Sequence, residues 1–243
     1  PVGTAPCFIV ETERNAVVSL PGVPNEMEHV LHESIIPYLQ KRFNLNEVIK
    51  VRVLHCAGLG EGMIDEKITD LEMLSNPTVG LAAHTGVVDV RIAAKAKSES
   101  EANAMIDEIE SQVRERLGDV VFGVDEDRLE EVTLDLIAKH GWTLTAIESD
   151  LNGLLARKIP HAVSFSNLTA DSLMQALRAA RADSDFALGV AVYPEERAAE
   201  MAMITPQGEK THRITYGGPP RSLPYWAVNL ALNWLRMTVE EMK

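Results

Sequence analysis

The chain has 243 residues, of which 46% are hydrophobic, enough for two or three domains with buried cores. Its 36 acidic and 23 basic side chains give a formal net charge of −13, which argues against a protein that binds nucleic-acid phosphates. No apolar run approaches the ~18 residues of a membrane span and no signal peptide is visible, so we expect a cytoplasmic protein. Cys7 and Cys56 lack metal-ligand or redox spacing, which suits two free thiols in a reducing cytosol.

Residues 1–46 have the pattern of the end of a larger domain. The chain begins at Pro1 rather than at Met, so we expect a piece of a longer or processed polypeptide. A short apolar strand, Ala16–Leu20, leads into the rigid turn Pro21–Pro24, and Asn25 is the expected N-cap of the helix that follows. A strand, a tight turn and a helix N-terminus can form an anion-binding corner or an ordinary connection, and the shape alone favours the connection.

The segments Pro1–Pro6 and Leu20–Met27 resemble the closing part of the molybdopterin-binding-like domain of CinA, the competence/damage-inducible proteins of bacteria. In that family the domain is associated with ADP-ribose pyrophosphatase activity and a divalent metal. The resemblance implies that its ligand-facing loops include Gly3, Thr4, Pro21, Gly22, Pro24 and Glu26. The earlier strands of the family's doubly wound sheet are absent, and about 45 residues cannot bury a core alone. We therefore expect this part to pack on its neighbours and to bind neither a nucleotide nor a cofactor.

Residues 47–123 follow the order β-α-β-β-α-β, which is the split βαβ arrangement of an α+β domain. Val48–Cys56 alternates as a strand does, and a glycine-containing loop leads from it into a helix that Asn76-Pro77 breaks. Residues 78–94 are typical of a hairpin that turns at His84–Gly86. A capping box, Ser98 with Glu101, predicts the start of the second helix.

This block resembles the KH-like middle domain of CinA along its whole length. Its glycines Gly58, Gly60 and Gly62 suggest the loop that clamps nucleic acid in KH domains, but residues 48–123 carry 8 basic and 13 acidic side chains, a net charge of −5. A basic stripe and stacking aromatic residues near the loop are also missing. We expect a spacer or a dimer surface rather than a nucleic-acid-binding domain, with Arg91 and Lys95 on a solvated face.

Residues 124–243 alternate helices with strands, which predicts a three-layer α/β domain. Asp127 is the expected cap of a first helix that ends at His140-Gly141. Trp142–Ile147 follows as a strand, then the polar turn Glu148–Gly153 and a second helix from Leu154 onward. The remaining expected elements are a helix capped by Thr169, strands over Phe186–Val192, Ala199–Ile204 and Lys210–Tyr216, and a final helix from near Pro224.

Ser149 lies in the polar turn, where a strand's carboxyl end is expected to meet a helix N-terminus and where ligands often bind. Its hydroxyl could be a nucleophile, a contact to phosphate or the helix cap. The residue types of the turn favour the cap.

The C-terminal region resembles the nicotinamide-nucleotide amidohydrolase (PncC-like) domain of CinA, most clearly in Leu129–Gly153 and Gln175–Val190. That family hydrolyses the carboxamide of nicotinamide mononucleotide with a serine nucleophile activated by a lysine, and an Ala-Glu-Ser-Cys-Thr-Gly-Gly turn holds the ligand. This chain has Ile147-Glu-Ser-Asp-Leu-Asn-Gly153 at that turn. The resemblance therefore implies Ser149 as the candidate nucleophile, with Glu148 and Gly153 as ligand contacts.

The departures from the family pattern concern the chemistry itself. Asp150 puts a carboxylate where a phosphate would lie, and two like charges ~4 Å apart repel by roughly 4 kcal/mol at an effective dielectric of ~20. If the segment around Phe165 is the remnant of the family's Tyr-Ser-Asn-x-x-Lys segment, Phe165 replaces the tyrosine, Ala170 replaces the lysine, and the nucleophile loop is deleted. Lys158 and His161 lie nearby without the family's spacing, and a serine without a base is a poor nucleophile.

Three functions compete on this sequence. The first, which we favour, is a CinA-like protein whose deamidase domain has lost its catalytic residues and serves assembly, ligand sensing or support of the pyrophosphatase-like domain. The second is an active nicotinamide mononucleotide deamidase with a rearranged site around Ser149, and the third is a nucleic-acid-binding KH protein. The expected partners are a nucleotide of the nicotinamide mononucleotide or ADP-ribose type and, from the resemblance, a second copy in a homodimer. Neither a nucleic acid nor a membrane is expected.

Overall fold

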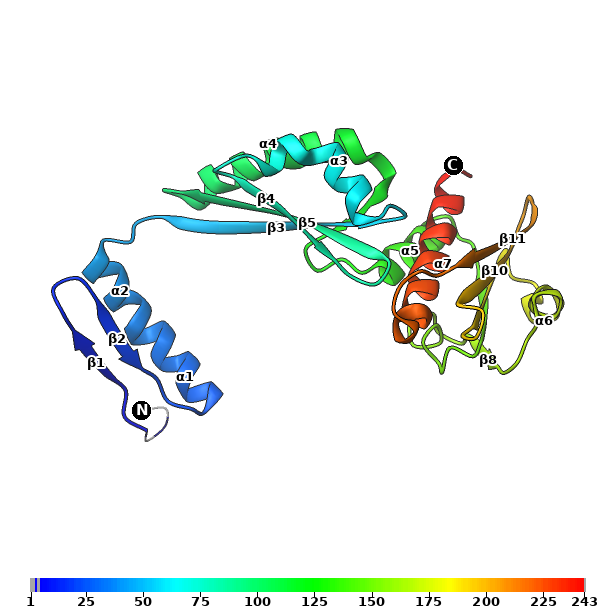
Figure 1. Ribbon diagram of the computed structural model, residues 1–243, viewed down its shortest axis with the longest axis horizontal. Helices are drawn as coiled ribbons and strands as arrows, with labels where there is room; N and C mark the ends of the chain where they lie inside the picture. Colours follow the sequence, from blue (N-terminus) through cyan, green and yellow to red (C-terminus); the bar gives the residue numbers. More distant parts are fainter. Residues whose placement is uncertain (1–2, 4, 243) are drawn as a thin grey trace.

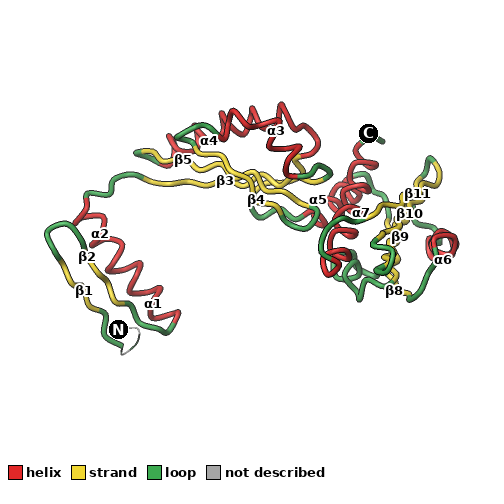
Figure 2. The backbone as a smooth tube through the Cα atoms, in the orientation of Figure 1, coloured by secondary structure: helices red, strands yellow, loops and turns green. Residues whose placement is uncertain are grey.

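The computed structural model describes Gly3 and residues 5–242, which form three separate β-sheets with their helices (Figures 1 and 2). A hairpin with a helical rod lies at one end, a four-stranded sheet under two helices lies in the middle, and a five-stranded sheet lies at the other end. The mixed α/β and α+β multidomain class predicted from the sequence is confirmed.

The N-terminal unit, residues 5–46, is an antiparallel hairpin beside a helical rod (Figure 1). Val23 rather than Asn25 is the N-cap, because Pro24 takes the first helical position, where a missing N–H costs nothing. Its elements are β1 (Phe8–Glu11), β2 (Ala16–Ser19), α1 (Pro24–Val30), a π turn (Leu31–Ile35) and α2 (Ile36–Phe43).

The N-terminal unit stands apart from the rest of the molecule. Of its described residues only Pro21 and Ile35 are buried, and none makes a hydrogen bond or ion pair with residues 47–242. The prediction that this part packs on its neighbours is therefore wrong. The reason is the exit from the rod: Asn44 ends α2 with a left-handed φ of 52°, and the extended chain then runs directly into the middle sheet (Figure 2).

The middle domain has the sheet order β4-β5-β3-β6, all antiparallel, which confirms the split βαβ arrangement. Both helices cover one face of the sheet (Figure 1), and the core between them is built on side chains such as Leu54, Ile92 and Ile106. On the open face Arg91 and Lys95 are exposed, as predicted. The elements are β3 (Val48–Ala57), α3 (Glu61–Glu72), β4 (Thr78–Ala83), β5 (Val87–Ala96), α4 (Glu99–Leu117), a 3-10 turn (Gly118–Val120) and β6 (Val121–Val124).

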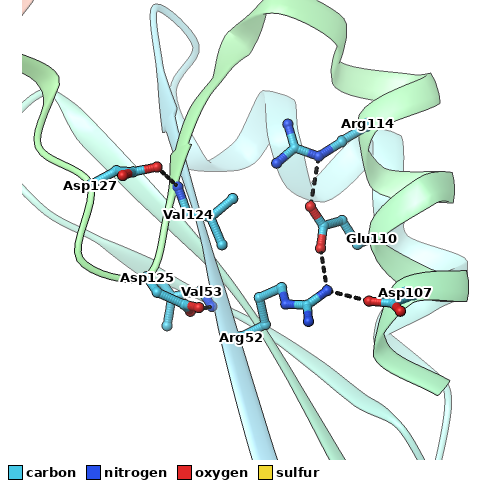
Figure 3. Close-up of polar contacts among 8 residues, drawn as sticks. All are labelled: Arg52, Val53, Asp107, Glu110, Arg114, Val124, Asp125 and Asp127. Carbon is cyan, nitrogen blue, oxygen red and sulfur yellow. Dashed lines mark hydrogen bonds and ion pairs between the residues drawn. The ribbon is translucent and has the colours of Figure 1, made fainter. Parts of the chain in front are cut away.

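A charged network fixes α4 on the sheet (Figure 3). Arg52 of β3 pairs with Asp107 and, at 2.7 Å, with Glu110, which also accepts from Arg114 Nε at 2.7 Å. Burial alone would raise the pKa of the Glu110 carboxyl, but the two guanidinium groups hold that pKa below its ordinary value. Figure 3 also shows Val53 N donating to the Asp125 carboxylate at 2.9 Å, which ties β3 to the chain that leaves β6.

The C-terminal domain has the sheet order β11-β10-β9-β7-β8, in which the pairs of β7 are parallel and the others are antiparallel. One helix, α6, packs on one face and the other two on the opposite face, so the predicted three layers are present. The elements are α5 (Leu129–Lys139), β7 (Leu144–Ser149), β8 (Val163–Phe165), α6 (Ala170–Arg181), β9 (Phe186–Tyr193), β10 (Ala198–Thr205), β11 (Gly208–Thr215), a 3-10 turn (Pro220–Ser222) and α7 (Leu223–Glu240).

Two local predictions in this domain are wrong. Residues 151–161 form successive hydrogen-bonded turns instead of a helix, because Asp150, Asn152 and Gly153 have positive φ and Pro160 cuts the segment short. Asp127 does not cap α5: the N-cap is Arg128, without a side-chain bond, since the Asp127 carboxylate accepts from Val124 N at 2.8 Å. The short edge strand β8 was not predicted at all.

Helix α7 joins the C-terminal domain to the middle domain. Arg236 of α7 is only 2% exposed, and its guanidinium donates to the Asp119 carbonyl oxygen at 2.6 Å and to Asn233 Oδ1 at 2.8 Å. About two turns earlier on the same helix face, Asn229 Nδ2 donates to the Thr85 carbonyl oxygen at 2.8 Å. Burial lowers the pKa of Arg236, and the Glu240 carboxylate, 3.0 Å from the guanidinium, opposes this shift.

We expect Arg236→Ala to lower the free energy of unfolding by about 2–4 kcal/mol, because it leaves the Asp119 carbonyl oxygen and the buried Asn233 side-chain oxygen without their donor. Urea denaturation of the whole chain measures this. The control is Arg114→Ala, whose side chain is 43% exposed and whose loss should cost less than about 1 kcal/mol. Equal costs for the two variants would contradict the assigned role of Arg236.

Candidate functional site

Ser149 is the last residue of β7 and is fully buried. Its Oγ donates to the Asp150 carboxylate at 2.7 Å and accepts from Leu168 N at 3.1 Å. Asn167 N also donates to that carboxylate, at 2.9 Å. Asp150 makes these contacts because it takes a left-handed φ of 60°, which turns its side chain back over the end of the strand. The hydroxyl therefore fastens the end of β7 to the loop before α6, and it does not cap the next segment as predicted.

The basic side chains that sequence reasoning placed near Ser149 lie elsewhere. Lys158 Nζ pairs with Glu130 Oε2 at 2.7 Å, beside the middle domain. Burial alone would raise the pKa of Glu130, but the Lys158 ammonium group lowers it below its ordinary value. His161 is exposed and makes no hydrogen bond with any described residue. Within the described part of the chain, no Lys or His side chain hydrogen-bonds to Ser149.

Glu148 and Gly153, the predicted ligand contacts, serve the turn itself. The Glu148 carboxylate is 1% exposed, and it accepts from Leu155 N at 2.8 Å and from Ser164 Oγ at 2.6 Å. It thereby holds the turns after β7 and the edge strand β8 on the sheet. Gly153 has a φ of 77°, which a residue with a side chain rarely adopts, so glycine is needed for the turn.

A cavity of about 370 Å³ opens beside Asp150, at the carboxyl ends of β7 and β9. Its charged lining residues are all acidic, namely Asp150, Glu195 and Glu196. The Tyr193 Oη in its wall is buried without a hydrogen-bond partner among the described residues, and burial, followed by the nearby Glu200 carboxylate, raises the pKa of this phenol. A cavity with this lining suits a cationic or neutral group and disfavours a phosphate.

The predicted N-terminal site residues are only partly brought together. Gly3 has a φ of 87° and lies directly against the Glu26 side chain, which would collide with a Cβ at this position. Pro21 is buried, whereas Gly22 and Pro24 face outward. Thr4 lies outside the described residues. Across the described part of the chain, no group of three or more His, Cys, Asp or Glu side chains is placed to hold a metal ion.

The glycine loop of the middle domain contacts the C-terminal domain. Gly58, with a φ of 95°, lies so close to Asn233 Nδ2 of α7 that a Cβ would meet it at 2.8 Å. The neighbouring turn does the same through Gly86, whose Cβ position is 3.2 Å from the Asn229 Cβ. This end of the middle sheet is therefore a packing surface for α7.

His55 fixes the chain where it passes from the middle to the C-terminal domain. Its Nδ1 lies 2.7 Å from the Asp89 carboxylate and its Nε2 lies 2.7 Å from the Asp125 carbonyl oxygen. Both partners are acceptors, so the ring must carry protons on both nitrogens to make both bonds. Burial alone would lower the pKa of His55, but the bonds to Asp125 and Asp89 outweigh it and raise that pKa above its ordinary value.

Both cysteines are free thiols, as predicted. Burial raises the pKa of Cys56 to about 12, so this thiol stays protonated and unreactive.

The comparisons with known proteins agree on one family. Residues 51–123 match the family described as the damage-inducible protein CinA KH domain. A putative competence-damage inducible protein of Caldanaerobacter subterraneus is 45% identical over 157 residues, which cover 65% of this chain and 37% of the relative. A CinA-like protein of Kosmotoga olearia is 38% identical over 173 residues, covering 71% of this chain and 42% of the relative. Residues 51–123 belong to the CinA KH domain family, and the chain is similar to competence-damage inducible and CinA-like proteins over about two thirds of its length.

The chain spans about two fifths of the length of these CinA relatives. Among solved structures, a competence or damage-inducible protein from Enterobacter asburiae is similar over 47% of this chain and 99% of its own, at 13% identity and a TM-score of 0.41. The KH-like identity predicted for the middle of the chain is confirmed by the family match. Within residues 5–242, no helix is both long and apolar enough to cross a membrane.

Sequence reasoning missed the polar residues of α7 that contact the middle domain. It placed the apolar stripe of this helix in the core but left out Asn229, Asn233 and Arg236. Their spacing of four and then three residues is itself helical, so a second, polar stripe was present in the sequence. Its partners could not be read there, because Thr85 and Asp119 lie more than 100 positions away.

We expect Ser149→Ala to lower the free energy of unfolding by about 1–2 kcal/mol, because the N–H of the half-buried Leu168 loses its acceptor and the Asp150 carboxylate loses a donor. Ser166→Ala is the matched control, since Ser166 is exposed and its hydroxyl makes no hydrogen bond with the described residues. Chemical denaturation compares the two. A neutral Ser149→Ala would mean that these hydrogen bonds do not stabilise the fold.

We expect the His55 contacts to make stability depend on pH. Because the pKa of His55 is raised on folding, its contribution is fully present below the unfolded value of about 6.5 and is lost as the pH rises through the folded pKa. The free energy of unfolding should therefore fall more between about pH 6 and pH 9 for the unmodified chain than for His55→Gln. His161→Gln, a change at an exposed ring, should keep the slope of the unmodified chain. Parallel pH profiles for all three proteins would contradict the imidazolium assignment.

Proposed function

We propose that this chain is a CinA-like protein whose C-terminal domain keeps the deamidase scaffold without deamidase catalysis. The observation that carries this proposal is the burial of the Ser149 hydroxyl, which is engaged by Asp150 and Leu168 and is hydrogen-bonded to no lysine or histidine among the described residues. A nucleophilic serine must reach its substrate and must pass its proton to a base. Here the neighbour that takes the hydrogen bond is a carboxylate, which also occupies the end of the strand.

The charge of the adjoining cavity supports the same proposal. A nicotinamide mononucleotide bound there would bring its phosphate towards the carboxylates of Asp150 and Glu195, while the Glu196 carboxylate is paired with Arg213. In a partly enclosed cavity such like-charge contacts cost several kcal/mol in total. The cavity thus opposes the binding of the nucleotide as well as its hydrolysis.

The role that we propose in place of catalysis is assembly. The docking of α7 on the middle domain uses polar side chains and closely packed glycines, which is typical of a permanent contact.

We further propose that the protein is cytoplasmic, in line with its two free thiols, and that it forms a homodimer. We also propose that it does not bind nucleic acid, in line with its negative charge and the packing of the Gly58 loop against α7. For the divalent metal of the family's complete N-terminal domain, the described residues provide only Glu26 beside Gly3, so no step is assigned to a metal.

The release of ammonia from nicotinamide mononucleotide by the purified chain tests the proposal. We expect no release above a heat-killed control. The alternative, an active deamidase with a rearranged site around Ser149, requires turnover of ~1 per second or above. It also requires that Ser149→Ala abolish this turnover while Ser166→Ala retains it. Turnover with that dependence would overturn the proposal.

A further inference from the structure

A second cleft, of about 500 Å³, lies where the middle domain meets the C-terminal domain, and we call it the junction cleft. The middle domain contributes His55, His84 and Asp89 to its lining, and the C-terminal domain contributes Arg128 and Lys158. It is separate from the cavity beside Asp150, with which it shares no lining residue. Its volume is that of ordinary small-molecule sites, which often lie between domains.

The carboxylates of this cleft already have partners within the protein. Asp89 is hydrogen-bonded by His55 at 2.7 Å and by His84 at 2.9 Å. Glu130 is paired with Lys158 at 2.7 Å. The carboxylate of Asp127 accepts from Val124 N at 2.8 Å. The cleft therefore offers little unpaired negative charge to a cation.

One cationic group of the cleft, the guanidinium of Arg128, has no such partner among the described residues. Arg128 is exposed at its rim, and its guanidinium makes neither an ion pair nor a hydrogen bond with any residue that the structure describes. His55 is held as an imidazolium by its two acceptors, and His84 makes a second imidazole contact to the same carboxylate. With His55 as an imidazolium, the three cations His55, Arg128 and Lys158 balance the three carboxylates of the lining. In a chain with a net charge of −13 this cleft is therefore locally neutral and, within the described part of the chain, Arg128 is its unpaired charge.

Aromatic rings complete the lining. Tyr225, at the start of α7, is 54% exposed beside the cleft, and Phe122 stacks on His55 with a centroid distance of 5.8 Å. An exposed ring and an unpaired guanidinium in the lining of one cleft suit a flat ligand with one negative group, because the ring can pack against the ligand while the guanidinium binds its oxygens.

We propose that the junction cleft binds a small aromatic anion, a single ring bearing a carboxylate or phosphate group, with Arg128 as its charged contact. Such a ligand touches both domains, so its binding also stabilises their docking. The junction cleft shares no lining residue with the cavity beside Asp150, so this proposal does not depend on the proposed loss of deamidase catalysis.

Isothermal titration of the whole chain with benzoate tests this site. We expect saturable binding in about the millimolar range, and binding of benzamide, which has the ring without the charge, at least about tenfold weaker. Arg128→Gln should weaken benzoate binding about tenfold or more, whereas Arg14→Gln, a change of an exposed arginine in the N-terminal unit, should leave it unchanged. Asp150→Asn should also leave it unchanged, which distinguishes the junction cleft from the cavity beside Ser149.

Two results would overturn the proposal. The first is no saturable heat from benzoate, and the second is benzoate binding that Arg128→Gln does not weaken. Titration with inorganic phosphate and with phenyl phosphate separates the two anion sources: phenyl phosphate should bind more tightly than benzoate if the natural group is a phosphate. Binding of inorganic phosphate without any binding of benzoate or phenyl phosphate would overturn the aromatic class of the ligand.

Discussion

The buried guanidinium of Arg236 is the constraint on which the arrangement of the two larger domains depends. A charge that is 2% exposed must keep its hydrogen bonds, and one of them ends on the Asp119 carbonyl of the middle domain. Helix α7 therefore packs on the sheet of its own domain and is hydrogen-bonded to the middle domain at the same time. The glycine loop at Gly58 and the turn at Gly86 follow from this docking, since only residues without a Cβ allow the helix to approach so closely. The junction cleft is what remains between the docked surfaces.

The same use of polar groups for structure explains the region around Ser149. In this turn the side-chain oxygen atoms of Glu148, Ser149 and Asp150 accept hydrogen bonds from backbone N–H groups and hydroxyls, most of them in the segments that follow β7. Those loops form no regular helix, so their backbone groups need such partners. A catalytic serine needs the opposite environment, with an open approach and a free base. The polar groups of this turn therefore have structural roles, which supports the proposed absence of deamidase catalysis.

Periodicity in the sequence predicts those parts of the fold that depend on neighbouring residues. The alternating strands of the middle domain, the Ser98 cap and the apolar stripe of α7 are of this kind, and the structure confirms them. The failures have specific causes. Apolar spacing after Leu154 suggested a helix, but left-handed residues and Pro160 prevent it, and Asp127 looks like a cap until its turn with Val124 is seen. The junction cleft could not be predicted, because His55, Arg128 and Tyr225 meet only through long-range docking.

The central claim, that the Ser149 hydroxyl is a buried structural group, can be tested without any substrate. A fluorophosphonate probe modifies serines whose hydroxyl is activated and accessible, and peptide mass spectrometry locates the modified residue. The structure predicts that the folded chain remains unmodified at Ser149, as expected for a side chain with no exposed surface whose hydroxyl is held by the Asp150 carboxylate and by Leu168 N. Rapid and stoichiometric labelling of Ser149 in the folded chain, absent after heat denaturation, would contradict this account and would favour a rearranged catalytic site.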